Sequence, residues 1–352
     1  MAEPNNKKKT PIALFLLVFV AVLIVMFIAN YRSPLIQTLR GPKDGVQKLS
    51  TYGEHITAIS RSNKVYSWDW NDLSGQPQVR AVNAQKVVAM SAERLIGVLS
   101  GKNNVLVVSN LKGDRELKRL PLGVGKKCKQ LEVSPNGKYA VAAVATDGGS
   151  DNDIELAVTD ADLTSISQVV IRTLERDEFP LHNIGVSNDG ALVTAVGGKY
   201  SGQILVANTQ SKQVLWEQTI ANSSQLNNVI FSPDGQMIFA SEEGRYVYVF
   251  ESATGKLIRR LAMDIYETPP NNPQTISCIA VSPDGRLLTA SSAPASRVWV
   301  WDVKSGAKIE VIGTGHFWTS GISFSPDSSL LAISDLTTSP IKIWRISGSE
   351  LK

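Results

Sequence analysis

A short turn sequence that recurs along the chain most constrains its fold. Four copies share Ser, then Pro or Asn, then Asp or Asn, then Gly, and a fifth has Ser in place of Gly: Ser134–Gly137, Ser187–Gly190, Ser232–Gly235, Ser282–Gly285 and Ser325–Ser328. Proline presets φ for a turn, Asp or Asn bonds the local backbone, and Gly accepts positive φ. Short apolar segments flank each copy, so each predicts a tight hairpin between two strands.

The spacing of these turns predicts the architecture. Weaker copies begin at Ser50 and Ser91, and the seven serines are 41, 43, 53, 45, 50 and 43 residues apart. A period of roughly 40–50 residues built from short strands is the sequence signature of a β-propeller. The sequence therefore predicts an all-β, seven-bladed propeller.

The end of the third strand in several repeats resembles the WD40 family. Trp68-Asp69 and Trp301-Asp302 match its signature dipeptide, Phe250-Glu251 and Trp344-Arg345 are degraded copies, and Gly315-His316 resembles its Gly-His pair. The resemblance covers roughly residues 34–347 and implies the fold more than any function. The second to fourth repeats lack the Trp-Asp pair, so a related propeller family of the YVTN type remains an alternative.

The last repeat lacks a fourth strand, because the chain ends soon after Trp344. Residues 34–39 precede the first repeat and resemble the fourth strands of other repeats, such as Lys256–Leu261. We therefore expect residues 34–39 to pair with residues 341–346, completing the seventh blade and closing a propeller that spans residues 34–347.

An apolar segment precedes the propeller. Residues 11–29 contain no charge, follow a basic tail of residues 1–10 with Lys7, Lys8 and Lys9, and would form a helix about 28 Å long. We interpret residues 11–30 as an uncleaved transmembrane signal anchor. The alternatives are a cleaved signal peptide, which usually has a shorter apolar region and a small-residue cleavage site, and a buried core helix. The lysine cluster predicts a cytoplasmic N-terminus and an extracytoplasmic propeller in a single-pass protein.

This arrangement predicts which face of the propeller lies nearest the membrane. Strands alternate in direction within a blade, so a fourth strand begins on the face that carries the recurring turns. Only a few residues separate Ala29 from Pro34, and they span at most about 18 Å. We therefore expect the face with the Ser-Pro-Asp-Gly turns to lie against the membrane.

Composition narrows the classes of partner. The first 30 residues carry three Lys and one Glu, a net +2, so the other 322 residues contribute only +2 to the total of +4. This small excess does not indicate a nucleic-acid surface. Cys128 and Cys278 are the only cysteines, which excludes a disulfide framework and favours two buried thiols.

The long loops on the face away from the turns are the expected binding surface, because loops on a rigid scaffold usually carry binding residues. Many are acidic, which is consistent either with a solvated surface or with docking of a basic protein partner. The candidate partner-binding residues are Asp151, Asp153, Glu178, Tyr200, Glu243, Asp264, Tyr266 and Arg297.

No catalytic, cofactor or metal site is predicted. His55, His182 and His316 have no metal-ligand neighbours at helical or hairpin spacing, and Asp147–Asp153 lacks the spacing and terminal Glu of an EF-hand loop. We therefore expect a membrane-anchored scaffold for an unidentified protein partner. The alternative is a propeller enzyme or small-ligand sensor that uses the central channel, and three or more charged or His side chains in that channel would favour it.

Overall fold

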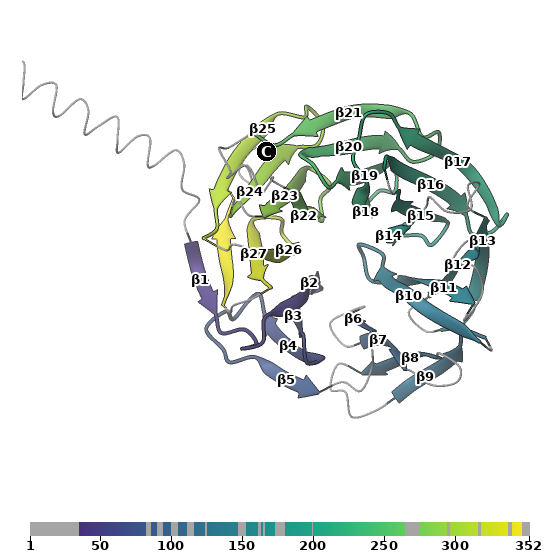
Figure 1. Ribbon diagram of the computed structural model, residues 1–352. Coiled ribbons are helices and arrows are strands. Elements are labelled where there is room, and N and C mark those ends of the chain that lie inside the picture. The colour runs from purple at the N-terminus through teal and green to yellow at the C-terminus, as the bar shows by residue number, and fades with distance from the viewer. Residues whose placement is uncertain are drawn as a thin grey trace, which may run out of the picture.

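The computed structural model describes residues 35–81, 86–89, 94–99, 105–110, 116–123, 125–146, 153–160, 163–164, 166–172, 180–198, 200–264, 275–293, 296–315, 318–336 and 340–346. Their strands form seven four-stranded antiparallel sheets, arranged as the blades of a ring (Figure 1). The all-β, seven-bladed propeller expected from the turn spacing is confirmed. The described residues contain no helix that is long and apolar enough to cross a bilayer. The expected anchor, residues 11–30, lies outside the described residues.

Each blade runs outward from the ring axis, and blades 1 to 4 use consecutive strands. Blade 1 contains β2 (Val46–Tyr52), β3 (His55–Ser60), β4 (Lys64–Asp69) and β5 (Gln78–Ala81). Blade 2 contains β6 (Lys86–Ala89), β7 (Arg94–Leu99), β8 (Val105–Asn110) and β9 (Glu116–Pro121). Blade 3 contains β10 (Lys126–Val133), β11 (Tyr139–Thr146), β12 (Asp153–Asp160) and β13 (Ile166–Arg172). Blade 4 contains β14 (Leu181–Val186), β15 (Leu192–Gly197), β16 (Gly202–Asn208) and β17 (Gln213–Ile220).

Blades 5 and 6 follow the same order, and blade 7 combines both ends of the propeller. Blade 5 contains β18 (Leu226–Phe231), β19 (Met237–Glu242), β20 (Tyr246–Glu251) and β21 (Leu257–Ala262). Blade 6 contains β22 (Thr275–Val281), β23 (Leu287–Ala293), β24 (Arg297–Asp302) and β25 (Lys308–Gly313). Blade 7 contains β26 (Thr319–Phe324), β27 (Leu330–Asp335), β28 (Ile341–Arg345) and, as its outer strand, β1 (Leu35–Leu39).

The core lies between neighbouring blades. The middle strands are buried on both sides, as in β23, because each blade is covered by the blade before it and the blade after it. Outer strands such as β17 are exposed along most of their length. Trp299 and Trp301 of β24 are fully buried against β20 of blade 5. The alternating apolar residues of each strand are thus divided between two inter-blade clusters rather than between a core and solvent.

The recurring turns are built by the same set of hydrogen bonds in five blades. In blade 5 the Ser232 hydroxyl donates to Oδ1 of Asp234 at 2.5 Å, and that oxygen also accepts the backbone N–H of Gln236 at 3.0 Å. The Ser232 oxygen accepts the N–H of Met237 at 2.9 Å, and Gly235 closes the turn with a φ of 71°. Ser and Asp therefore satisfy the backbone donors that the reversal leaves unpaired, and Gly takes the left-handed conformation.

Deviations from the motif keep its chemistry. Asn136 replaces Asp in blade 3, and its side-chain oxygen accepts the Ser134 hydroxyl at 2.7 Å and the Lys138 N–H at 3.0 Å. Ser328 replaces Gly in blade 7 and still adopts a φ of 64°. The carboxylate charge and the glycine are each dispensable for the shape of the turn, whereas a side-chain acceptor is present in all five copies.

The two faces of the ring differ in what they carry. We call the face with the recurring turns the turn face, and the opposite one the loop face. Third-to-fourth strand turns share the turn face, since the Ser252 N–H donates to the Gln236 carbonyl at 2.9 Å. Second-to-third loops and inter-blade connections share the loop face, since the Glu243 N–H donates to the Gln225 carbonyl at 2.8 Å.

β1 closes the ring by pairing antiparallel with β28, with Leu35 opposite Trp344 and Leu39 opposite Ile341. This agrees with the closing strand predicted for residues 34–39. Trp344 also pairs with Leu331, just after the turn of blade 7, so β1 starts at the turn-face end of its blade. Leu39 is 2 % exposed and packs in the cluster between blades 7 and 1, whereas Ile36 is 40 % exposed.

Leu39 and Ile36 make a matched pair for testing closure. We expect Leu39→Ala to lower the free energy of unfolding by about 2–5 kcal/mol, because it leaves a cavity in a packed cluster. Ile36→Ala on the same strand should change it by about 0.5 kcal/mol or less. Urea denaturation followed by tryptophan fluorescence measures both values, and equal effects would show that β1 contributes no inter-blade packing.

A pH-dependent contribution is expected from the turn carboxylates. The Ser187 hydroxyl bond, opposed by partial burial and aided by the Ala191 N–H, holds the pKa of Asp189 below its ordinary value of 3.8. A lowered folded-state pKa adds stability above the unfolded-state pKa, and this stability is lost as pH falls through the folded-state pKa.

Asp189→Asn should therefore lower the free energy of unfolding by about 1 kcal/mol at pH 7. The difference in this free energy between variant and wild type should become smaller below pH 4. Asn136 shows that Asn fits this turn, so the substitution removes charge alone. Glu217→Gln on the exposed strand β17 is the control for loss of one carboxylate and should leave the denaturation midpoint at pH 7 nearly unchanged. Denaturation midpoints between pH 3 and 7 provide the measurement, and a constant difference would contradict the assignment.

Candidate functional site

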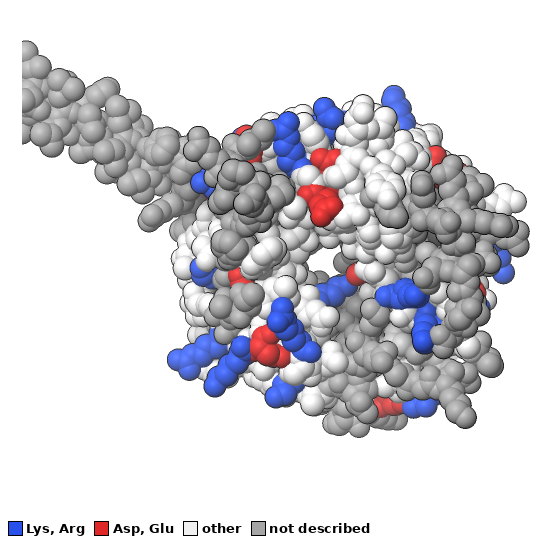
Figure 2. Space-filling view, in the orientation of Figure 1, with Lys and Arg blue, Asp and Glu red and all other residues white. Residues whose placement is uncertain are grey.

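The centre of the ring contains a cavity of about 320 Å³ in the turn-face half of the channel. Its described walls come from the inner strands and turns of blades 1, 3, 4, 5, 6 and 7. Figure 2 shows the ring hollowed at its centre, with side chains of both charge signs scattered around the opening. A volume of this size is typical of pockets that hold small molecules.

Most of the cavity wall is apolar. Ile230 of β18, Ile279 and Val281 of β22 are only half-buried, because they line the channel as well as an inter-blade cluster. Pro135 and Pro233 of the recurring turns stand at the turn-face mouth, where Pro283 occupies the same place in blade 6. The alternation that buries these strands between blades therefore leaves apolar side chains facing the lumen.

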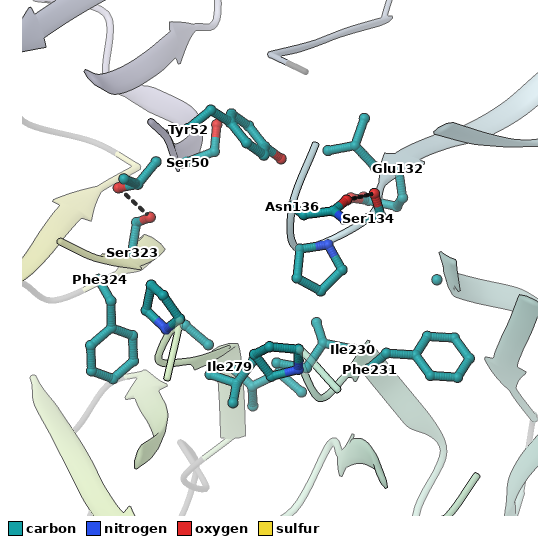
Figure 3. A pocket seen from close by; sticks show the side chains of 18 of the residues that line it. Ser50, Tyr52, Glu132, Ser134, Asn136, Ile230, Phe231, Ile279, Ser323 and Phe324 are labelled. Atoms are coloured by element: carbon teal, nitrogen blue, oxygen red, sulfur yellow. Dashed lines mark hydrogen bonds between the residues drawn. The ribbon is translucent and has the colours of Figure 1, made fainter. Parts of the chain in front are cut away.

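Polar groups are concentrated on the side formed by blades 1 and 3. Lys48 of β2 forms a partly buried ion pair with Glu132 of β10, reaching across the position of blade 2. Figure 3 places Tyr52 and Glu132 on one side of the cavity and Ile230 and Ile279 on the other. Burial, and secondarily the Glu132 charge, raises the pKa of Tyr52, so its phenol is neutral at physiological pH.

The mouth of the cavity is held by hydrogen bonds between adjacent turns. The Asn136 backbone N–H donates to Oδ1 of Asn188 at 2.8 Å, and the Asn136 amide donates to the Asn188 carbonyl at 2.9 Å. The Asn188 amide then donates to the Pro233 carbonyl at 2.6 Å. Asn in place of Pro at the second turn position of blade 4 thus links three consecutive blades.

The loop-face half of the channel is shaped by β-bulges. The register shifts by one residue in the inner strand of each of blades 1, 3, 4, 5, 6 and 7, as between Leu181 and Asn183 of β14. The bulged His182 lies 2.9 Å through Nδ1 from the Leu226 carbonyl of blade 5, which gives it a structural contact between blades.

Neither cysteine forms a disulfide, and both are half-buried. Cys278 follows a bulge in β22 and contacts the Thr319 carbonyl of blade 7 at 3.7 Å. Burial raises the pKa of this thiol to about 12, opposed by weaker effects of nearby hydroxyls and Lys48. A protonated thiol is a poor nucleophile, so Cys278 fits a packing role.

The structure describes the side chains of four predicted partner-binding residues, and these four belong to loop-face connections or strand ends. Tyr200 lies between β15 and β16 and is 74 % exposed. Glu243 accepts the Gln225 side-chain amide at 2.5 Å, and Asp264 forms an ion pair with Lys308 of blade 6. Arg297 begins β24 and is half-buried. They come from different blades and do not form one cluster.

The other four predicted residues are not described in full. Asp153 begins β12, and its side chain lies outside the described structure. The remaining three lie in segments beyond the described residues: Asp151, Glu178 and Tyr266.

The acidic character expected of this face is reduced by internal contacts. Glu242 is 5 % exposed and accepts the Tyr248 hydroxyl at 3.0 Å. With Glu243 and Asp264 engaged as described, these three described carboxylates are less available to a basic partner than the sequence pattern suggested. Within the described ranges, no group of three His, Cys, Asp or Glu residues is placed to hold a metal ion.

Sequence reasoning missed several features of these surfaces. Trp318, in the connection from blade 6 to blade 7, is 44 % exposed on the loop face. On blade 5 the guanidinium carbons of Arg260 and Arg245 lie 4.2 Å and 5.0 Å from the centre of the Tyr246 ring. The channel pair Lys48–Glu132 joins residues 84 positions apart. Aligning the repeats of the sequence could have identified Trp318 as an aromatic residue in a connection between blades. The Lys48–Glu132 pair could not be found in this way, because its two residues lie far apart in the sequence.

Comparison with known proteins places the sixth blade in a family. Residues 265–302, which include β22 to β24, match the family described as WD domain, G-beta repeat. The chain is a β-propeller whose blade 6 is similar to a WD40 repeat. The Trp301-Asp302 dipeptide ends this repeat, and Oδ1 of Asp302 accepts the Ser305 N–H at 2.7 Å and hydroxyl at 2.5 Å. The WD40 and β-propeller parts of the sequence resemblance are thereby supported.

Two known proteins resemble this β-propeller over different lengths. The chain is 25 % identical over 213 residues to a Dictyostelium discoideum protein named Periodic tryptophan protein 2 homolog, a match covering 47 % of this chain and 23 % of that one. It therefore spans only about a quarter of that relative's length. The solved β-propeller domain of Myceliophteria thermophila Cps50 (Swd1) superposes with a TM-score of 0.66 and 14 % identity, covering 88 % of this chain and all of that one. At this identity the likeness shows the fold alone.

Proposed function

We propose that this WD40 propeller is a scaffold that binds a protein partner through its loop face. The supporting observation is the exposure of Tyr200 at 74 % and Trp318 at 44 % on connections held by a rigid ring. Tyr, Trp and Arg dominate the energetics of protein interfaces, because they bury large area with few rotatable bonds. The Arg245–Tyr246–Arg260 stack adds such residues on the same side of blade 5.

The channel gives the enzymatic alternative less support than the loop face gives the scaffold. Among the described lining residues, the charged ones are Lys48 and Glu132, and they neutralise each other. General acid–base chemistry needs a titratable group placed near a reacting atom, with its pKa near the working pH. Lys48 and Glu132 are engaged with each other, and the phenol of Tyr52 is neutral, so the scaffold is the better supported function.

A photo-crosslinking amino acid placed at Tyr200 or Trp318 tests the scaffold. We expect both positions, in native membranes, to capture the same protein, and we expect Tyr200→Ala with Trp318→Ala to weaken its binding at least tenfold. The same crosslinker at Leu257, which is 47 % exposed at the turn-face start of β21, is the matched control and should not capture it. Equal capture at all three positions, or none, would rule out loop-face recognition.

We also propose that residues 11–30 anchor the protein in a membrane with the propeller outside the cytoplasm and the turn face toward the bilayer. The support is the uncharged segment 11–29, the preceding lysines, and the start of β1 at the turn-face end of blade 7. The partner would then be met by the loop face, which points away from the bilayer.

Probes at Lys304 on the turn face and Trp318 on the loop face test this orientation. In a background of Cys128→Ser and Cys278→Ser, we expect a fluorophore on Lys304→Cys to be quenched more by a lipid-phase quencher than one on Trp318→Cys. Both sites are exposed, Lys304 in a turn of blade 6 and Trp318 in the connection from blade 6 to blade 7, so the two probes differ mainly in the face that carries them. Stronger quenching at Trp318→Cys would show that the loop face, not the turn face, lies toward the bilayer. Release of the protein from membranes by alkaline carbonate would show that residues 11–30 do not anchor it.

A further inference from the structure

The turn-face half of the channel forms a pocket with a mostly apolar described wall. Its volume of about 320 Å³ exceeds what packing defects leave in a domain, where voids rarely exceed one water molecule. The described part of the wall is contributed by inner strands of six blades, which the inter-blade clusters hold in place. A cavity of this kind binds a ligand with little rearrangement, which favours affinity.

One side of the pocket would be poorly solvated by water. Ile230, Ile279 and Val281 are half-buried and face the lumen. Figure 3 shows Ile230 and Ile279 across the cavity from Tyr52. Removing this surface from water favours an apolar occupant in proportion to the area covered.

The opposite side defines the polar end of the ligand. The Lys48 ammonium and Glu132 carboxylate are already paired, so a charged ligand would have to break that pair and leave one ion uncompensated. The Tyr52 phenol is a neutral hydrogen-bond donor, and Figure 3 shows its hydroxyl directed into the cavity. This side therefore suits one uncharged hydrogen-bonding group and disfavours an ion.

We propose that the turn-face half of the channel binds a small, uncharged, mostly apolar ligand whose single polar group reaches Tyr52 and the Lys48–Glu132 pair. This site is separate from the loop-face surface, so it stands independently of the proposed scaffold. The ligand enters from the turn face, where Pro135, Pro233 and Pro283 surround the mouth. The linked turns of blades 3 to 5 keep that mouth open.

The probe for this proposal is 1-aminoanthracene, a neutral fluorophore with one amine whose emission shifts to the blue in apolar surroundings. The full chain in nanodiscs is titrated with it, and the signal from empty nanodiscs is subtracted to remove partition into lipid. We expect a saturable component with one site per protein. Partition alone, with no saturable component, would overturn the proposal.

Three variants test the geometry. Ile279→Phe narrows the apolar side and should weaken binding more than tenfold, whereas Tyr52→Phe removes only a hydroxyl and should weaken it about three- to tenfold. Val79→Phe enlarges a residue on the outer strand β5 that is 49 % exposed, and it should leave binding unchanged. Equal binding by all three variants would place the dye outside the channel.

A second measurement covers the case in which Ile279→Phe fails to fold. Wild-type protein is photolysed with 1-azidoanthracene, and the modified peptides are identified by mass spectrometry. Adducts on β2, β18 or β22 that 1-aminoanthracene suppresses would support the pocket. Adducts confined to outer strands, or unaffected by the competitor, would contradict it.

Discussion

The pairing of β1 with β28 is the constraint on which the rest of the structure depends. A blade has no core of its own, and its middle strands are buried only when a neighbour covers each side. Six clusters of described residues join successive blades, and the one between blades 7 and 1 contains Leu39 from the closing strand. Without β1, blade 7 would end in a three-stranded sheet, and the ring would be joined there by fewer contacts. Closure therefore converts seven marginal sheets into one cooperative ring.

The recurring turns carry out two tasks at once. Within a blade, Ser and Asp or Asn supply the acceptors that complete each reversal, as Ser232 and Asp234 do. Between blades, the same positions hold neighbours together, as Asn188 does for blades 3, 4 and 5. The hydrogen bonds between turns thus hold the turn-face mouth of the channel in place, so the pocket has a rigid entrance. The loop face lacks such a repeat, and its connections vary in length and composition, which suits specific recognition.

Prediction of the candidate sites from the sequence was uneven for a physical reason. The loop-face residues could be assigned to one face because strand direction alternates, and Tyr200 is indeed exposed there. The sequence did not show whether a charged loop residue is available to bind a partner. Asp264 forms an ion pair with Lys308 of the next blade, and Glu242 accepts a hydrogen bond from Tyr248. The channel was equally hidden, since Lys48 and Glu132 converge from blades 1 and 3. These contacts depend on how blades twist and pack, which leaves no periodic trace in the chain.

The sequence by itself determined the number of blades, the strand order within them and the position of the closing strand. These features follow from local turn chemistry and from a missing fourth strand, both of which are visible in short stretches of residues such as Ser282–Gly285. Only the tertiary structure decided which polar residues meet across blades, which of them are neutralised, and which apolar side chains face the channel. The inner strands show why: Val229 and Ile230 are adjacent apolar residues of β18, yet Ile230 is half-buried at the lumen while Val229 is 3 % exposed. Their difference is set by the curvature of the closed ring, which exists only after all seven blades have packed.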